Sequence, residues 1–189
     1  MANKDAAFGL KPIGKVGQNG ANNGLSEYSI AASATAIYFQ DPVAMAATGT
    51  VTVAAAGGVL LGSLNGVFFT DATTSKPTFA NHLNASNTAT DIKGFVTDDP
   101  YQRYEVQSDN TGASAQTDIG NVADIVYAAG SSPDYVSKVE LDDSDLATSD
   151  GQLKVIGVSR DPENNDLTSA NVNFVVTINE HFLKQEAGV

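Results

Sequence analysis

Residues 172–179, VNFVVTIN, form the stretch that decides the fold class of this chain. Apolar side chains occupy every second position in it, namely Val172, Phe174, Val176 and Ile178. Successive side chains of a β-strand point to opposite faces, whereas one face of a helix needs apolar residues three and four positions apart. The stretch therefore predicts a β-strand with one face buried in a core.

The same two-residue period recurs along the chain, and turn residues separate the repeats. The further predicted strands are residues 27–32, 36–40, 43–46, 50–54, 59–69, 92–96, 101–107, 123–127, 136–141 and 153–159. Thr48-Gly49 predicts a hairpin turn between two of these strands. Asn65-Gly66 predicts another, which divides residues 59–69 into two short strands.

Helical periodicity is nearly missing from the sequence. No segment has apolar residues at positions i, i+3, i+4 and i+7 over three turns, and only residues 114–121, SAQTDIGN, are compatible with one helical turn. We therefore expect an all-β protein with a compact body that resembles a β-barrel or β-sandwich, with long loops and little helix.

Loop and turn residues outline the domain organisation. Residues 1–26 contain GQNGANNG and further glycines, which predicts an extended N-terminal arm that is either flexible or docked. Residues 27–189 are expected to form the β-rich body, with a division into two β subunits, about 27–97 and 98–189, as an option. Residues 70–91 are rich in Thr, Asn and Ser, which predicts a long exposed connection.

The composition excludes several classes of protein. The 189 residues include no cysteine and two histidines, which excludes disulfides, thiolate metal sites and sites made of several histidines. The net charge of −12 disfavours nucleic acids and anionic membranes as partners, because their phosphates attract Lys and Arg. No apolar run follows the first lysine, so no secretory signal is expected. The longest apolar stretch is too short and too interrupted to span a membrane.

The charge is unevenly distributed along the chain. Residues 1–97 contain five basic and five acidic side chains, whereas residues 98–189 contain five basic and seventeen acidic ones. All the net negative charge therefore lies in the second half. An acidic excess usually marks a solvated surface that favours solubility. The alternative is a two-sided molecule, which docks through a neutral and apolar side and exposes its acidic side to water.

Motifs for catalysis or ligand binding are missing. The sequence has no G-x-S-x-G nucleophile turn, no phosphate-binding loop and no G-x-G-x-x-G. His82 in the polar connection and His181 at the end of the last strand are expected to have surface or structural roles. The acidic runs DDSD at 142–145 and DPENND at 161–166 offer oxygen ligands for calcium, but turn formation by Asp and Asn explains them better. We expect no enzymatic activity, no cofactor and no bound metal.

A series of motifs in a fixed order resembles a known group of proteins. The stretches that carry the resemblance are residues 19–31, 37–58, 59–71, 98–109, 119–126, 153–166 and 171–181. Together they resemble the capsid decoration, or cement, proteins of tailed bacteriophages. The resemblance implies a structural virion protein that binds the outside of a phage capsid and stabilises it. It also implies synthesis in the host cytoplasm and a final location on the capsid exterior.

The resemblance also implies partners, namely the major capsid protein and further copies of this chain, with a homotrimer favoured over a dimer. The arm is the candidate for docking, through apolar Phe8, Leu10, Ile13 and Val16 and basic Lys4, Lys11 and Lys15. An arm that folds back on its own body or stays mobile is the alternative. The other functional classes left open are a β-rich surface or fibre module and a carbohydrate-active enzyme. A major capsid protein would need a long spine helix, which the sequence does not show.

Overall fold

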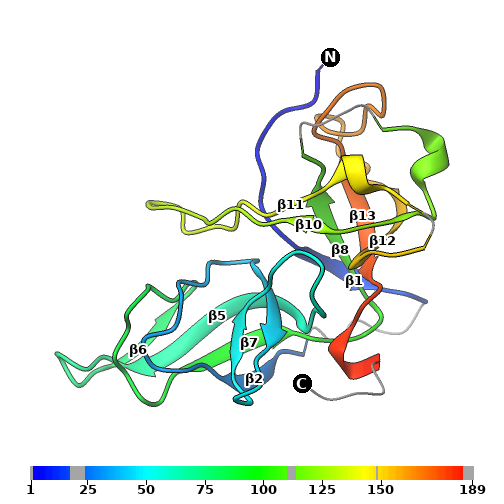
Figure 1. The fold of residues 1–189 in the computed structure, drawn as a ribbon. Helices are drawn as coiled ribbons and strands as arrows, with labels where there is room; N and C mark the ends of the chain where they lie inside the picture. The colour runs from blue at the N-terminus through cyan, green and yellow to red at the C-terminus, as the bar shows by residue number, and fades with distance from the viewer. Residues whose placement is uncertain (1, 18–23, 110–113, 148, 185–189) are drawn as a thin grey trace.

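The computed structural model describes residues 2–17, 24–109, 114–147 and 149–184, and Figure 1 shows that β-strands dominate them. The all-β fold class is therefore confirmed. Helical structure in the described ranges is confined to three short 3-10 turns, η1 Gln116–Asp118, η2 Asp143–Asp145 and η3 Phe182–Lys184. The first of them is the turn expected from SAQTDIGN. No helix in this part of the chain is long and apolar enough to cross a membrane.

Five antiparallel strands form one large sheet. In spatial order they are β1 Lys11–Lys15, β8 Gln102–Gln107, β13 Asn173–Ile178, β12 Leu153–Val158 and β9 Val122–Ala123. A separate antiparallel pair, β10 Ile125–Val126 and β11 Glu140–Leu141, packs against the buried face of this sheet (Figure 1). All of these strands except β1 come from the second half of the chain.

The strands of residues 26–97 form a six-stranded sheet. Its spatial order is β2 Ser26–Ser29, β7 Lys93–Thr97, β5 Gly62–Thr70, β3 Pro42–Met45 and β4 Val51–Val53, and β6 Pro77–Ala80 also pairs with β5. The strand order of neither large sheet returns to its first strand, so the described strands form open sheets and no closed barrel. The chain passes from one sheet to the other between Thr97 and Gln102.

Each large sheet buries one face in a hydrophobic core of its own. The four alternating apolar side chains of residues 172–178 are all at most 1% exposed, which confirms the strand predicted there. They pack with Tyr104 of β8 and Leu153 of β12. The second core lies against the six-stranded sheet, where Leu64 and Val67 of β5 and Val96 of β7 are buried.

Hydrogen bonds join the two sheets to each other. The Leu60 N–H donates to the Glu180 carbonyl (2.9 Å), and the Phe182 N–H donates to the Leu60 carbonyl (2.8 Å). The side-chain amide of buried Gln152 donates to the Ala55 carbonyl at 2.9 Å. Because a buried polar group that loses its partner destabilises the fold, these bonds hold the two halves in one arrangement.

The prediction of a hairpin turn at Asn65-Gly66 is wrong. Strand β5 runs without interruption from Gly62 to Thr70, and the pair forms an irregularity in the register between β5 and β7. The favoured hairpin turn requires a positive φ at both central residues, and neither Asn65 nor Gly66 has one. Pairing with β7 on one side and with β6 on the other keeps this stretch extended.

Two stretches expected to lack regular structure contain strands. The polar connection at 70–91 includes β6, whose Phe79 lies beside Phe68 across the β5–β6 pair. The expected arm at 1–26 includes β1, because pairing with β8 holds it extended and Gly14 falls at an irregularity in the register. Glycine accommodates such a bulge without a steric penalty.

Two local expectations around the start of the six-stranded sheet have different outcomes. Residues 36–40 are not a strand, since Ile37 and Phe39 form only isolated bridges. The hairpin predicted at Thr48-Gly49 is confirmed, because β3 and β4 pair around it and Gly49 has a φ of +74°. A positive φ at a turn is the conformation that glycine adopts most readily.

Asp41 is a buried carboxyl group between the two halves of the chain. Its side chain is fully buried, and its Oδ2 accepts a hydrogen bond of 2.7 Å from the Tyr38 N–H. Burial raises the pKa of Asp41 to about 6, an effect that the Ser137 hydroxyl and the Tyr38 N–H only partly oppose. The folded state therefore holds this proton more tightly than the unfolded chain. The stabilisation is complete below about pH 4 and is lost as the pH rises through about 6.

We expect the substitution Asp41→Asn to change the pH dependence of stability, because the amide stays neutral at every pH. Between about pH 4 and about pH 7 the wild type should lose up to about 3 kcal/mol of stability that the variant keeps. This figure corresponds to a pKa change of about two units. Urea denaturation of both proteins across this range measures the difference. Parallel pH curves would contradict the assignment.

Candidate functional site

The two histidines do not form a catalytic centre with the other described residues. The His82 ring stacks on Tyr135 with 3.8 Å between ring centroids, and its Nδ1 lies 2.8 Å from the Asn81 side-chain oxygen. His181 is fully buried, and its Nδ1 accepts a hydrogen bond of 3.1 Å from the Leu183 N–H. Burial lowers the pKa of both imidazoles, so both are neutral near pH 7. Within the described ranges, no group of three or more His, Asp and Glu side chains is arranged to hold a metal ion.

The two acidic runs form local turn contacts. In DDSD, Asp142 Oδ1 accepts hydrogen bonds from the N–H (3.0 Å) and the hydroxyl (2.6 Å) of Ser144. In DPENND, Asp166 Oδ1 accepts from the N–H (2.9 Å) and the hydroxyl (2.7 Å) of Thr168. Asp side chains commonly make such bonds with the backbone two residues further on. The turn interpretation of both runs therefore has direct geometric support.

The N-terminal segment is fastened to the chain's own body. The Lys4 carbonyl accepts hydrogen bonds from the side-chain amides of Gln107 (2.9 Å) and Asn164 (2.7 Å). Leu10 is fully buried in the core of the five-stranded sheet. Leu10 is thus a core residue of this chain, and the hypothesis that it contacts a capsid needs correction.

The other residues of the docking hypothesis lie nearer the surface. They are Lys4, Phe8, Lys11, Ile13, Lys15 and Val16. Lys11 and Lys15 each pair with a carboxylate of this same chain, at 3.1 and 2.5 Å. Ile13 and Val16 are 46% and 43% exposed, so these two keep an apolar surface that a partner can cover.

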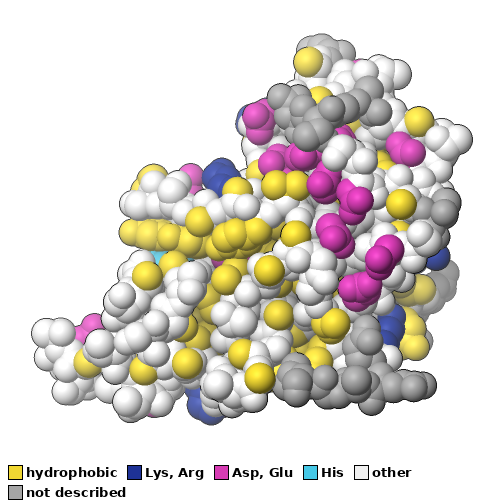
Figure 2. All heavy atoms as spheres, viewed as in Figure 1, with side chains coloured by type: hydrophobic (Ala, Val, Ile, Leu, Met, Phe, Trp, Pro, Cys, Tyr) yellow, Lys and Arg dark blue, Asp and Glu magenta, His cyan; other side chains and the backbone are white. Residues whose placement is uncertain are grey.

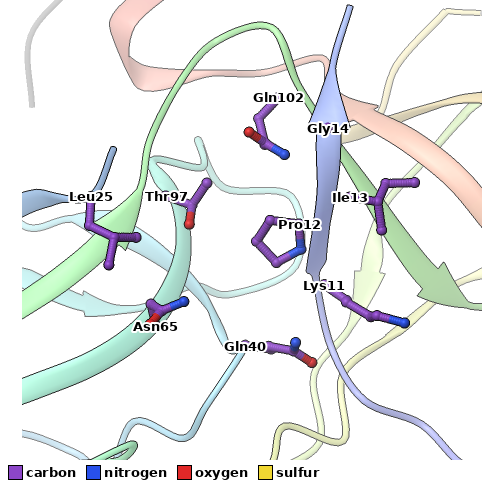
Figure 3. Close-up of a pocket in the computed structure, with 9 residues that line it drawn as sticks. All are labelled: Lys11, Pro12, Ile13, Gly14, Leu25, Gln40, Asn65, Thr97 and Gln102. Carbon is purple, nitrogen blue, oxygen red and sulfur yellow. The ribbon is translucent and has the colours of Figure 1, made fainter. Parts of the chain in front are cut away.

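A groove runs beside strand β1, as Figure 3 shows. It has a volume of about 420 Å³ and is lined by Lys11, Pro12, Ile13, Gly14, Leu25, Gln40, Asn65, Thr97 and Gln102. Pro12, Thr97 and Gln102 point into the space between β1 and the six-stranded sheet (Figure 3). Lys11 is the one charged side chain in this lining, and it is paired with Glu105. The rest of the lining combines apolar side chains with the amide and hydroxyl groups of Gln40, Asn65, Thr97 and Gln102.

The outer side of the six-stranded sheet carries an aromatic face, which consists of Phe68, Phe79 and Phe95. Phe68 on β5 and Phe79 on β6 are register partners, and their ring centroids lie 4.8 Å apart. Phe95 on β7 is the register partner of Gly66, and its ring centroid lies 6.3 Å from that of Phe79. Phe79 is 74% exposed, the highest value among the large hydrophobic residues described.

The charged residues beside the aromatic face neutralise each other. Lys93 is the register partner of Phe68, and Glu27 is the register partner of Phe95. Register partners on neighbouring strands share one side of a sheet. The ammonium of Lys93 lies 3.3 Å from the Glu27 carboxylate. The aromatic face is therefore an apolar surface with an electrically neutral border.

The acidic side chains gather on the other half of the molecule. Figure 2 shows Asp and Glu side chains lying next to one another on the half that contains the five-stranded sheet. Part of this surface is an acidic hollow of about 240 Å³, lined by Gly57, Asp124, Asp145, Ala147, Asp150, Gly151 and Glu180. Burial, followed by the charges of Asp150 and Asp124, raises the pKa of Glu180. The uneven charge of the sequence is thus an uneven charge in space.

Comparisons of this chain with protein-family models, with curated proteins and with solved structures find no match. The functional conclusion therefore depends on the surfaces described above and on the resemblance found in the sequence.

The aromatic face was missed in the sequence because its three members come from three separate segments. Phe68 and Phe95 lie in predicted strands, but Phe79 lies in the stretch 70–91, which was interpreted as a polar connection. The available signal was that Phe79 is the one Phe, Tyr or Trp in that stretch. A single exposed aromatic residue is normal in proteins, so this signal alone does not indicate a face.

We expect Leu10→Ala and Ile13→Ala to affect stability differently. Removing the buried Leu10 side chain leaves a cavity in the core and should lower the free energy of unfolding by about 2–5 kcal/mol. Removing the half-exposed Ile13 side chain should lower the free energy of unfolding by less than about 1 kcal/mol, because part of this side chain is in contact with water in both the folded and the unfolded state. Guanidinium denaturation of the full chain measures both. Similar losses would show that residue 10 is not a core position.

Proposed function

We propose that this chain is a structural protein of a tailed-bacteriophage particle, which binds the outside of the capsid and stabilises it. The observation that carries the proposal is the separation of the neutral aromatic face from the acidic surface, on different halves of the molecule. A protein that coats a shell needs one surface for the shell protein to cover and another that stays hydrated. The resemblance to decoration proteins supports the same role, with the major capsid protein as partner.

The aromatic face has the properties of a docking surface. Phe79 exposes most of its side chain, and Phe68 and Phe95 lie beside it. Full burial of a Phe side chain stabilises a complex by about 1.5–3 kcal/mol. Aromatic residues at the centre of a contact often supply most of its binding free energy. We therefore place Phe79 at the centre of the contact with the shell.

The six-stranded sheet holds these rings in position before binding. Phe68 on β5 and Phe95 on β7 belong to strands that have partners on both sides. A mobile arm would lose about 1–2 kcal/mol of conformational entropy per ordered backbone residue on docking. Sheet residues lose that entropy on folding instead, so the aromatic face is a better docking element than a mobile arm. Ile13 and Val16, which also lie on an ordered segment, provide a second apolar contact.

The acidic half fits the outward side of a coat protein. Seventeen acidic and five basic side chains belong to residues 98–189. A surface with this excess of negative charge binds water strongly and repels other particles of the same kind. The same surface would weaken a contact with a negatively charged shell, so it favours the orientation with the six-stranded sheet inward.

A cryo-electron microscopy map of particles that contain this chain tests the role directly. We expect density for the chain outside the shell, with the six-stranded sheet towards the shell and the acidic half towards solvent. Density in a tail fibre would support the alternative of a fibre module. Density inside the shell, or none on the particle, would contradict the proposal.

We expect Phe79→Ser to weaken the binding of the chain to shells built from the major capsid protein. The dissociation constant should rise by about tenfold or more, which corresponds to a loss of about 1.4 kcal/mol or more. Co-sedimentation of the purified chain with shells stripped of it measures the change. The matched control is Leu183→Ser, since Leu183 is 52% exposed but lies in η3, outside the aromatic face. Equal losses of binding in the two variants would contradict the assignment of the face.

A further inference from the structure

The outer side of the five-stranded sheet carries an unpaired basic row. Arg103 of β8, Thr177 of β13 and Lys154 of β12 are register partners across three neighbouring strands. Their side chains therefore share one side of the sheet, opposite the side that forms the core. Lys154 is exposed, and Arg103 and Thr177 are half-buried. Neither Arg103 nor Lys154 forms an ion pair with any residue that the structure describes.

The neighbouring positions leave this side of the sheet positive. Lys11 of β1 is paired with Glu105 of β8, so these two charges cancel. Ile156 of β12 adds an exposed apolar side chain close to Lys154. The row thus combines apolar surface with two cations that have no ion-pair partner among the described residues, in the half of the chain where acidic side chains outnumber basic ones.

The acidic hollow is the complement of this row. Asp124, Asp145, Asp150 and Glu180 line it within a volume of about 240 Å³. Burial raises the pKa of Glu180, and the negative charges of Asp150 and Asp124 raise it further. Among the described residues these carboxylates are not arranged as ligands of a metal ion. The volume admits the end of a Lys or Arg side chain, which would neutralise part of the charge.

We propose that the occupant of the acidic hollow is a second copy of this chain, whose Lys154 and Arg103 contact the carboxylates of the first. Within one copy the basic row and the hollow do not pair with each other, so both are available to a neighbour. Each copy then contacts one neighbour through its basic row and binds the basic row of a neighbour in its acidic hollow. Such an assembly closes as a reciprocal dimer or as a ring of copies.

This interface does not rest on the proposed role in a capsid, because it is a property of the purified chain alone. Each copy has a net charge of −12, so two copies repel each other at long range. Opposite charges that meet locally offset this repulsion, and the row and the hollow are the two surfaces that provide them.

The test is the mass of the purified full chain in solution, measured by analytical ultracentrifugation up to about 1 mM. We expect a defined oligomer whose dissociation constant rises steeply with salt, because the Debye length falls from about 8 Å at 0.15 M to about 3 Å at 1 M. Lys154→Glu should raise the dissociation constant by roughly a hundredfold, since like charges would then meet. The double substitution Asp145→Lys with Asp150→Lys should do the same from the other side.

Combining Lys154→Glu with Asp145→Lys and Asp150→Lys should restore association, because the charges are then exchanged between the two surfaces. Lys76→Glu is the matched control with the same change of net charge, since Lys76 is exposed on the six-stranded half. Circular dichroism checks that each variant is folded. A wild type that stays monomeric at low salt, equal effects of Lys76→Glu and Lys154→Glu, or no rescue in the combined variant would each overturn the proposal. Shell binding is measured separately, so either proposal can fail alone.

Discussion

The hydrogen bond from the Tyr104 hydroxyl to the Thr97 carbonyl is 2.8 Å long and joins the half with the five-stranded sheet to the half with the six-stranded sheet. The relative positions of the aromatic face and the acidic surface depend on this connection. Tyr104 is fully buried on β8 in the core of the five-stranded sheet, and Thr97 is the last residue of β7 in the six-stranded sheet. Burial raises the pKa of this hydroxyl, so it remains a neutral donor across the physiological pH range. Because the sheets are held together here, a partner that covers the aromatic face leaves the acidic surface in water.

Features that depend on neighbouring residues or on composition could be predicted from the sequence. The alternation in residues 172–178 is local, and it is preserved in β13 with the expected side buried. The turn at Gly49 needs only a residue that adopts a positive φ. The division of charge follows from composition, and it becomes spatial because, β1 apart, the two large sheets take their strands from different halves of the chain. The uneven distribution of charge between the two halves was therefore predictable in outline.

Features that depend on pairing between distant strands could not be predicted. Asn65-Gly66 has the local signature of a turn, but the strands on either side of β5 keep it extended. Phe79 stands in a polar stretch, and only the pairing of β6 with β5 places it beside Phe68. The residues next to Leu10 in the sequence are those of an exposed arm. The core that buries its side chain comes mostly from the second half of the chain, so the local sequence does not reveal the burial. In each case the tertiary contact overrides the local preference.

The pairing of the cations in this chain distinguishes two kinds of contact. Lys11, Lys15 and Lys93 are paired with carboxylates of the same copy, which neutralises the surroundings of β1 and of the aromatic face. A contact made through these neutral surfaces relies on apolar burial, which moderate salt changes little. Arg103 and Lys154 form no ion pair with the residues that the structure describes. They lie in the acidic half, where a contact relies on opposite charges and weakens as salt screens them. The two proposed contacts therefore differ in their sensitivity to salt, and this physical difference lets the two be separated by experiment.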